Sequence, residues 1–447
     1  RARSEAQHAF GLDEVILEKA LQGPRHVEVQ IMADEQGHVI HLGERDCSVQ
    51  RRHQKVIEEA PCPAMTDELR SAMGETAVTA AKSIGYRGAG TVEFLLDEGD
   101  NFFFLEMNTR LQVEHPVTEM ITGLDLVAMQ IDIAQGLPLT LTQADVQFSG
   151  HAIEARLYAE DVGRGFLPCT GTVALWQPST AEHVRIDAGI DNGLHIGPHY
   201  DPMLAKFIAW GEDRESARCR LADALKMTVL FGLTTNRSFL VDALNQQAFA
   251  VGCVTTAFIE QAFGPEDLSP AVPSVECAAV AAVIQYRWQR DAARQRALSV
   301  PADLLDWSST GSLESRYRYV VAGNTLDLNV RAGGEDYRVR CEGTEITVRM
   351  VTDSDNKARI EVEGCTVDIV YESQSGTRTH LFMDGEAWCF DNQMVAAALP
   401  ETPGGDGRVL APMHGRVTEI MVEAGDVVRK GQRLASLEAM KMEHEID

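Results

Sequence analysis

Polar and apolar residues alternate along residues 106–115, Glu-Met-Asn-Thr-Arg-Leu-Gln-Val-Glu-His. Because successive side chains of a strand point to opposite faces, this pattern predicts an extended strand with one polar face. That face would carry two carboxylates, two amides and a guanidinium, from Glu106, Asn108, Arg110, Gln112 and Glu114. An ordinary strand with one solvated face alternates in the same way, so the pattern alone leaves its role open.

Residues 92–105 have the pattern of two strands joined by a turn at residues 98–101. If that turn is symmetric, Glu93 lies directly opposite Glu106 on one face of the sheet. Neighbouring carboxylates repel each other unless a cation lies between them. A hard divalent cation with oxygen ligands suits such a pair, and Mg²⁺ bridging phosphates fits best. The alternative is that both carboxylates face solvent.

The same periodicities predict further elements. Alternation predicts a strand over residues 24–34 with a hairpin partner over 37–42, and a short strand at 15–19. Apolar residues at helical spacing predict helices over residues 65–84, 124–135 and 276–297, the first of them opened by Thr66. Residues 150–210 have the pattern of strands, followed by a helix near 213–230.

Short strands with recurrent turn residues fill residues 315–395. The turn residues are Gly323, Gly333, Gly343, Asn356, Gly364, Gly376 and Gly385. This spacing is typical of an antiparallel barrel or sandwich. The residues expected on its inner face are Tyr337, Val339, Cys341, Ile346, Val348 and Met350. Residues 398–408 are rich in proline and glycine and predict a flexible linker, after which a small β domain begins.

Composition narrows the class of protein. The chain has 447 residues, 45% hydrophobic and 24% charged, as expected for a soluble globular protein of three or four domains. Its net charge of −27 argues against a general nucleic-acid surface. No apolar stretch reaches the ~18 residues of a membrane helix. The nine cysteines are scattered without a Cys-x-x-Cys pair, which favours reduced thiols over disulfides or a zinc site.

A cluster of cations stands out against this acidic background. Arg45, Arg51, Arg52 and Lys55 lie close together in the sequence, with His53 among them. Guanidinium and ammonium groups in this density suit a phosphate or bicarbonate ligand. The alternative is a loop folded against the nearby acidic residues Glu44, Glu58 and Glu59.

Three separated motifs resemble one family. Residues 51–55 (Arg-Arg-His-Gln-Lys), 106–115 and 439–442 (Ala-Met-Lys-Met) are similar to the biotin-containing α subunits of acyl-CoA carboxylases, and the resemblance is densest over residues 12–260. It implies a multidomain α+β chain. The expected parts are an ATP-grasp portion of biotin carboxylase (1–150), a biotin carboxylase C-terminal domain (151–264), a helix with an antiparallel β-barrel that docks a β subunit (265–397), a linker (398–408) and an all-β biotinyl domain (409–447).

The resemblance also implies roles for individual residues. Those expected to bind nucleotide are Glu18, His26, Gln50 and His53. Those expected to hold Mg²⁺ or Mn²⁺ on ATP are Glu93, Glu106 and Asn108. Those expected to bind bicarbonate are Lys55, Arg110, Gln112 and Val113. The residues expected to take part in catalysis are Lys55, Arg110, Glu114 as general base and Arg156 beside the biotin enolate.

Lys441 is the expected site of biotin attachment. It lies between two methionines, after the Ala-Pro-Met and Gly-Asp segments typical of a biotin or lipoyl domain, and the methionines favour biotin. The family layout further implies ATP and bicarbonate as substrates, a biotin protein ligase as a partner, and a carboxyltransferase β subunit in an α6β6 assembly. Neither nucleic acid nor a membrane is expected as a partner. The family location would be the cytoplasm of a bacterium or the mitochondrial matrix of a eukaryote.

Three further points concern the extent of the chain, its acyl-CoA and an alternative class of protein. The family's N-terminal nucleotide domain and the second half of its biotinyl domain have no counterpart, so we expect a chain truncated at both ends. The region around Trp307-Ser308 and Ser315-Arg316-Tyr317 favours 3-methylcrotonyl-CoA or geranyl-CoA over propionyl-CoA. An alternative of another class is a non-catalytic assembly and carrier polypeptide that presents biotin.

Overall fold

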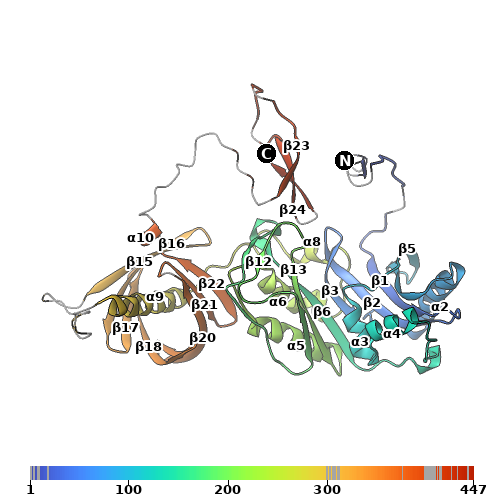
Figure 1. Ribbon diagram of the computed structural model, residues 1–447, viewed down its shortest axis with the longest axis horizontal. Coiled ribbons are helices and arrows are strands. Elements are labelled where there is room, and N and C mark those ends of the chain that lie inside the picture. Colours follow the sequence, from blue (N-terminus) through green and yellow to red (C-terminus); the bar gives the residue numbers. More distant parts are fainter. Residues whose placement is uncertain are drawn as a thin grey trace. The chain divides into compact units, whose positions relative to one another are not determined.

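The computed structural model describes residues 3, 6–7, 11–17, 20–297, 301, 304, 309, 313–374, 376–396, 409, 411, 415–423, 425–429, 431–439 and 442–446 (Figure 1). The chain forms two compact units. Unit 1 comprises Arg1–Glu154, Glu212–Arg214 and Gln247–Ala262, and unit 2 comprises Ala155–Gly211, Glu215–Gln246 and Phe263–Asp447. No helix among the described residues is long and apolar enough to cross a membrane.

Unit 1 is built on an antiparallel sheet in which five strands follow the order β3-β2-β1-β4-β5. The strands are β1 (Arg25–Ala33), β2 (Val39–Arg51), β3 (Gln54–Ala60), β4 (Gly88–Leu96) and β5 (Phe102–Asn108). The helices are α2 (Asp67–Ser83), α3 (His115–Thr122), α4 (Leu126–Ala134), α7 (Gln247–Ala250) and α8 (Phe258–Ala262), with a 3-10 turn η1 at Gln143–Asp145. The expected strands at 24–34 and 37–42 and the helix at 65–84 are confirmed, but β2 continues far beyond its expected end.

The alternation along β1 assigns the two faces of this sheet. Val27, Val29 and Ile31 pack against α2, whose Met73 and Ala77 are fully buried. The side chain of Thr66 caps α2 by accepting a hydrogen bond from the backbone N–H of Leu69 at 3.2 Å. The opposite face of β1 carries polar side chains, and only its far end is covered by the apolar residues of α4. The polar face is therefore where a site can form.

The β4–β5 hairpin follows the predicted pairing only in part. Glu93 does pair with Glu106, but Phe94 pairs with Phe104, so Leu105 forms a bulge between them. The cause lies in the turn, where the Asp97 carboxylate accepts hydrogen bonds from the backbone N–H groups of Gly99 and Asn101, both at 2.9 Å. The loop that results is not symmetric, and the bulge restores the expected register at the carboxylates.

One expectation about local structure is wrong, and one alternative left open by the sequence is excluded. Residues 106–115 do not form one strand, because β5 ends at Asn108 and α3 begins at His115, with Pro116 in its first turn. Residues 43–55 do not form a loop. They belong to β2 and β3, joined by a tight turn in which Arg52 and His53 have φ angles of 48° and 66°.

Unit 2 begins with short strands and two helices. The strands are β7 (Glu160–Asp161), β8 (Leu167–Pro168), β9 (Gly171–Thr172), β10 (Leu175–Gln177), β11 (Val184–Ala188), β12 (His195–Ile196), β13 (Met203–Gly211) and β14 (Val229–Phe231). The helices are α5 (Arg214–Met227) and α6 (Arg237–Asn245), with a 3-10 turn η2 at Val162–Arg164. Strand β6 (His151–Tyr158) runs across the division between the units.

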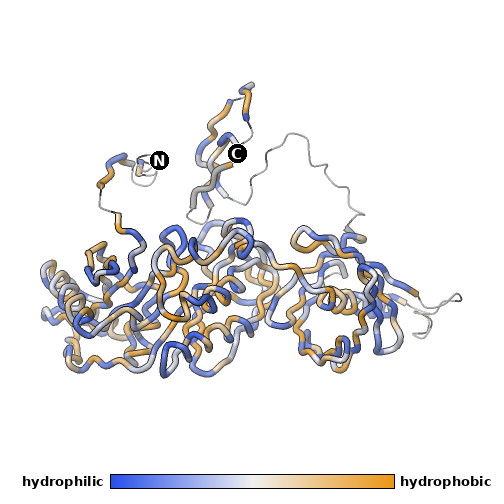
Figure 2. Tube along the Cα trace, turned by 180° about the vertical axis from the view of Figure 1, so that it is seen from behind, coloured by the Kyte–Doolittle hydropathy of each residue, from blue (hydrophilic) through white to orange (hydrophobic). Residues whose placement is uncertain are grey.

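An eight-stranded antiparallel sheet follows and wraps around one helix. Its strands, paired in sequence order, are β15 (Glu314–Val321), β16 (Asn324–Gly333), β17 (Asp336–Cys341), β18 (Thr344–Ser354), β19 (Lys357–Val362), β20 (Cys365–Gln374), β21 (Arg378–Met383) and β22 (Glu386–Asp391). A bridge between Tyr319 and Asn392 brings the first and last strands together, so the sheet is nearly closed. The alternation of hydrophilic and hydrophobic residues along these strands can be followed in Figure 2. The predicted barrel is confirmed.

Helix α9 (Val275–Arg296) forms the centre of this barrel (Figure 1). Every residue from Cys277 to Gln285 is buried, which a helix on a surface cannot achieve. All six residues expected on the inner face of the barrel are buried with it. The expected turn positions adopt left-handed conformations, except that Gly334 rather than Gly333 has the positive φ, because Gly333 ends β16.

A short helix α10 (Gln393–Ala396) ends the barrel. The region expected to carry biotin contains a three-stranded sheet of β23 (Arg416–Ile420), β24 (Ala435–Ala439) and β25 (Met442–Ile446). In the pairing of β24 with β25, Ala439 is opposite Met442. Lys441 itself lies outside the described residues.

Candidate active site

Four charged residues form a row across the polar face of the unit 1 sheet. Glu28 on β1 is the cross-strand partner of Arg45 on β2 and also of Glu93 on β4, and Glu93 is in turn the partner of Glu106 on β5. Arg45, Glu28 and Glu93 are buried. Three carboxylates in adjacent positions require compensating charge, which Arg45 alone does not supply.

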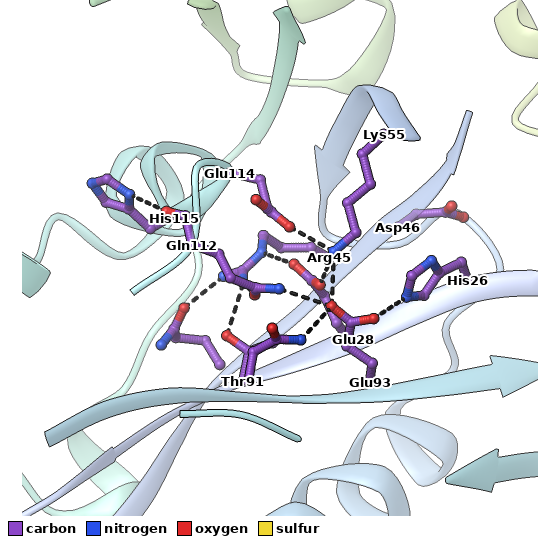
Figure 3. Close-up of polar contacts among 12 residues, drawn as sticks. His26, Glu28, Arg45, Asp46, Lys55, Thr91, Glu93, Gln112, Glu114 and His115 are labelled. Carbon is purple, nitrogen blue, oxygen red and sulfur yellow. Dashed lines mark hydrogen bonds and ion pairs between the residues drawn. The ribbon is translucent and has the colours of Figure 1, made fainter. Parts of the chain in front are cut away.

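Lys55 supplies the second positive charge. Its Nζ contacts Glu28 Oε2 at 2.6 Å, Glu93 Oε1 at 3.0 Å and Glu114 Oε1 at 2.6 Å (Figure 3). Burial alone would lower the pKa of Lys55, but the surrounding carboxylates, Glu28 foremost, raise it above its ordinary value. Lys55 therefore stays an ammonium ion, and its three donors each have an acceptor.

Glu93 is the residue to which the other polar groups converge. Its carboxylate contacts His26 Nε2 at 2.7 Å and accepts hydrogen bonds from Asn108 Nδ2 at 2.9 Å and Gln112 Nε2 at 2.8 Å, besides the contact with Lys55. Burial would raise the pKa of Glu93, but the bond with His26 and the charge of Lys55 hold it at about 2. The pKa of Glu28 is likewise held at about 2, because Arg45 and Lys55 outweigh its burial. Both carboxylates are ionised at neutral pH.

The residues expected to bind a divalent cation lie together. Asn108 Nδ2 is 2.9 Å from Glu93 Oε1 and 3.0 Å from Glu106 Oε1, so the amide lies between the two carboxylates. Rotation of the amide would turn its oxygen toward the same point and give three oxygen donors, a set that suits Mg²⁺ or Mn²⁺. His26, Glu28 and Glu93 form another group whose ligand atoms lie close enough together to hold one cation. The donor set therefore fits the expected metal.

The loop between β5 and α3 brings the remaining expected residues to this cluster. Gln112 and Glu114 are buried and contact Glu93 and Lys55, respectively. Arg110 is exposed, and its Nη2 donates to Asn108 Oδ1 at 2.9 Å. Val113 lies half-buried in the same loop. These side chains converge through the fold of a loop and not, as expected, through a shared strand face.

Only some of the residues expected to bind nucleotide lie in or next to this cluster. His26 belongs to the cluster, and Gln50 lies half-buried opposite Lys55 in the β2–β3 pairing. His53 is exposed in the turn that follows β2. Glu18 lies outside the described residues. Arg156 is buried on β6 and belongs to unit 2.

Glu28 and Arg45 are the functional candidates that the sequence did not assign a role. Glu28 is one of the polar residues that alternate along the strand at 24–34, and it shares a strand face with His26. This shared face was the signal in the sequence from which a role for Glu28 could have been predicted. Arg45 was counted among four cations expected to meet an anion, but its burial against Glu28 depends on strand register, which the sequence did not reveal.

Comparisons with known proteins agree with this geometry. Residues 1–142 match the family model of the carbamoyl-phosphate synthase L chain, ATP binding domain, residues 154–261 that of the biotin carboxylase C-terminal domain, and residues 407–447 that of biotin-requiring enzymes. Among solved structures, the biotin carboxylase domain of a thermophilic 2-oxoglutarate carboxylase bound to bicarbonate is 44% identical, with a TM-score of 0.57 over 60% of each chain. The biotin carboxylase domain of the Hydrogenobacter thermophilus 2-oxoglutarate carboxylase, in complex with MgADP, ADP and bicarbonate, is 43% identical. Its TM-score is 0.59 over 60% of this chain and 59% of that chain.

Full-length relatives extend the likeness to almost the whole chain. The methylcrotonoyl-CoA carboxylase α subunit of Arabidopsis thaliana, a mitochondrial protein, is 38% identical over 99% of this chain and 66% of its own length. The propionyl-CoA carboxylase α chain of Ruegeria pomeroyi is 36% identical over 99% of this chain and 69% of its own. The chain thus spans about two thirds of the length of the curated relatives it matches. From the likeness across carboxylase, barrel and carrier regions alike, the chain belongs to the family of acyl-CoA carboxylase α subunits.

Proposed function

We propose that this chain belongs to a subunit that uses ATP and bicarbonate to carboxylate biotin carried on Lys441, for transfer to an acyl-CoA on a carboxyltransferase β subunit. The observation that carries the proposal is the contact of Lys55 with Glu28, Glu93 and Glu114, beside the carboxylate and amide of Glu106 and Asn108. The reaction brings two anions together, ATP and bicarbonate, and this arrangement offers the Lys55 ammonium together with oxygen ligands for a divalent cation.

In this proposal bicarbonate binds beside the Lys55 ammonium, which in the structure contacts the carboxylates of Glu28, Glu93 and Glu114. Lys55, Arg110, Gln112 and the backbone of Val113 would hold the anion. Glu114 would act as the general base, since its carboxylate lies 2.6 Å from Lys55 Nζ and is thus close to any anion bound by that ammonium. Deprotonated bicarbonate attacks the γ-phosphoryl group of ATP and displaces ADP, and the carboxyphosphate formed releases CO₂ and phosphate.

Glu93, Glu106 and Asn108 would hold Mg²⁺ or Mn²⁺ on the ATP phosphates. Such an ion neutralises the phosphate oxygens and orients the γ-phosphoryl group for attack. Glu18, His26, Gln50 and His53 would bind the nucleotide. Arg156 would contact biotin during its carboxylation.

The domain boundaries follow the same proposal. The biotin carboxylase portion would comprise residues 1–150 and 151–264. The barrel that docks the β subunit would be residues 265–397, the linker 398–408 and the biotinyl region 409–447. A carrier on a linker raises the effective concentration of biotin at two distant sites. A biotin protein ligase would load Lys441, and the holoenzyme would be an α6β6 assembly located in a bacterial cytoplasm or the mitochondrial matrix.

The acyl-CoA favoured is 3-methylcrotonyl-CoA or geranyl-CoA. Part of the region behind this preference, Trp307 and Ser308, lies outside the described residues.

The test is ATP hydrolysis by the natural full-length subunit, measured with and without bicarbonate and free biotin. We expect hydrolysis that requires both bicarbonate and Mg²⁺ and is lost in Glu114→Gln. A streptavidin blot should detect the natural subunit but not Lys441→Arg. An equal rate of ATP hydrolysis with and without bicarbonate would overturn the proposal. Assays of the assembled enzyme with 3-methylcrotonyl-, geranyl- and propionyl-CoA would then decide the acyl group.

A further inference from the structure

Arg45 has no role in the reaction as proposed above, yet its guanidinium makes five hydrogen bonds to the surrounding side chains. It is fully buried on β2. Its Nε donates to Glu28 Oε1 at 2.6 Å, and Nη1 donates to Gln30 Oε1 at 2.8 Å and Thr118 Oγ1 at 3.0 Å. Nη2 donates to Thr91 Oγ1 at 3.3 Å and Gln112 Oε1 at 3.0 Å. All five N–H donors of the guanidinium are therefore used.

The bond to Gln112 fixes which way its amide faces. A glutamine amide has an oxygen on one side and an NH₂ group on the other, and the two ends are nearly the same size. Because Arg45 only donates, it holds Gln112 Oε1, and the NH₂ group is thereby directed to Glu93 at 2.8 Å (Figure 3). Without Arg45, Oε1 would lose its donor, and the amide would be held on one side only, by the bond of its NH₂ group to Glu93.

The bond to Glu28 fixes the position of the carboxylate that Lys55 contacts. Arg45 Nε occupies Glu28 Oε1, which leaves Oε2 as the oxygen that meets Lys55 Nζ at 2.6 Å. One buried guanidinium thus orients two residues expected to contact bicarbonate, one from β3 and one from the loop after β5. The strands that carry Arg45 and Glu28 are adjacent, so this support belongs to the rigid sheet.

We propose that Arg45 is a positioning residue for bicarbonate, acting through Gln112 and, by way of Glu28, through Lys55. This inference rests on the proposed function. Lysine in its place keeps the charge but has one ammonium head instead of a planar fork, so it cannot hold Glu28 and Gln112 together. Loss of the fork leaves Gln112 Oε1 without its donor, so the amide is held on one side only and the bicarbonate site is weakened. Among the described residues expected to bind nucleotide, His26, Gln50 and His53 are not hydrogen-bond partners of Arg45.

The test compares Arg45→Lys and Gln112→Met, singly and together, in the natural full-length subunit. We expect Arg45→Lys to raise the KM for bicarbonate about tenfold and to change the KM for ATP less than about twofold. In the Gln112→Met background the same substitution should raise the KM for bicarbonate by less than about threefold, because the route through Gln112 is already lost. Arg70→Lys, a substitution of a partly exposed arginine paired with Glu44 away from the cluster, is the matched control.

Equal effects of Arg45→Lys in both backgrounds would exclude the route through Gln112 and so overturn the proposal, which requires both routes. A parallel rise in the KM for ATP would overturn it in favour of a purely structural role. If Arg45→Lys does not fold, Thr91→Val removes a neighbouring acceptor of Nη2 while keeping the guanidinium, and should raise the KM for bicarbonate about twofold without changing that for ATP. No change in either constant would then overturn the proposal. A natural subunit whose ATP hydrolysis does not depend on bicarbonate would instead refute the proposed function itself, so the two failures are distinguishable.

Discussion

Glu93 and Glu106 are cross-strand neighbours on β4 and β5, and the amide of Asn108 lies within 3.0 Å of a carboxylate oxygen of each. The two carboxylates have different surroundings. Glu93 is buried among His26, Lys55 and Gln112, whereas Glu106 is exposed and bonded to Asn108. Glu93 is thus fixed by the protein, and Glu106 is free to meet a cation that arrives with its ligand.

Glu106→Gln should therefore weaken the metal site with little effect on the fold. Removing one negative ligand lowers the affinity for a divalent cation, because charge count sets much of that affinity. We expect the Mg²⁺ concentration for half-maximal bicarbonate-dependent ATP hydrolysis to rise about tenfold. Glu98→Gln, in the exposed turn of the same hairpin, is the control and should leave this concentration unchanged. An unchanged Mg²⁺ requirement in Glu106→Gln would exclude Glu106 as a ligand.

The sequence predicted the parts of this site that depend on strand parity. Glu93 and Glu106 were placed opposite each other because period-two alternation and a short turn constrain a hairpin closely. The prediction held at these residues although the turn was not symmetric, since the bulge at Leu105 compensates for the turn held by Asp97. The amphipathic helix at 65–84, the helix at 276–297 and the barrel were predicted from periodicity in the same way.

What the sequence could not supply was the pairing between strands distant in the chain. Arg45 and Lys55 belong to one run of cations, but Arg45 is sealed against Glu28 while Lys55 bridges three carboxylates from β1, β4 and the loop before α3. Alternation also predicted a strand over residues 106–115, whereas β5 ends at Asn108. Gln112 and Glu114 keep the parity of that strand, yet they reach the cluster because residues 109–114 form a loop. Long-range packing decides such cases, and no local pattern encodes it.

Lys55→Met should destabilise the protein at neutral pH. The substitution leaves Glu28, Glu93 and Glu114 facing one another without the ammonium, and breaking a buried ion pair from one side costs about 3–5 kcal/mol. Without the ammonium, the pKa values of Glu28 and Glu93 rise, so protonation at lower pH relieves the repulsion. We expect urea unfolding to show a deficit relative to the natural protein that is smaller at pH 5 than at pH 7. A deficit that does not change with pH would contradict this account of the cluster.

His380 should make the stability of unit 2 depend on pH. It is buried on β21 and stacks on Phe231 of β14, with ring centroids 5.3 Å apart, and burial lowers its pKa to about 4. In the unfolded chain its pKa is about 6.5, so between these values the unfolded state binds more protons and stability falls as pH falls. The natural protein should lose about 2 kcal/mol of its free energy of unfolding between pH 7 and pH 4.5 through this titration. His380→Phe removes the titrating group, so the variant should not show that loss. Urea unfolding at both pH values measures it, and equal losses in the two proteins would refute the assignment.

Gln285 should hold α9 in place inside the barrel. Its side chain is fully buried, accepts a hydrogen bond from the Tyr319 hydroxyl at 2.7 Å and donates one to the backbone oxygen of Gly376 at 3.0 Å. One turn later, Gln289 bonds with the Tyr317 hydroxyl at 2.9 Å and donates to the same Gly376 oxygen at 2.9 Å, but it is only partly buried. Leucine at position 285 would fill the space and leave the Tyr319 hydroxyl without its buried acceptor. We expect Gln285→Leu to lower the free energy of unfolding by about 2 kcal/mol.

Gln289→Leu is the matched control, because water can replace the partners of a half-exposed amide and the loss should be under about 1 kcal/mol. Gly376→Ala tests the same contact from the turn between β20 and β21. Gly376 has a φ of 68°, and a Cβ there would lie 2.4 Å from the Trp288 ring, so alanine combines a strained backbone with a clash against α9. Its loss in urea unfolding should exceed that of Gln285→Leu. If both leucine variants unfold at the same urea concentration as the natural protein, the polar bonds do not secure the helix, and apolar packing around Cys277–Gln285 suffices to keep α9 in the barrel.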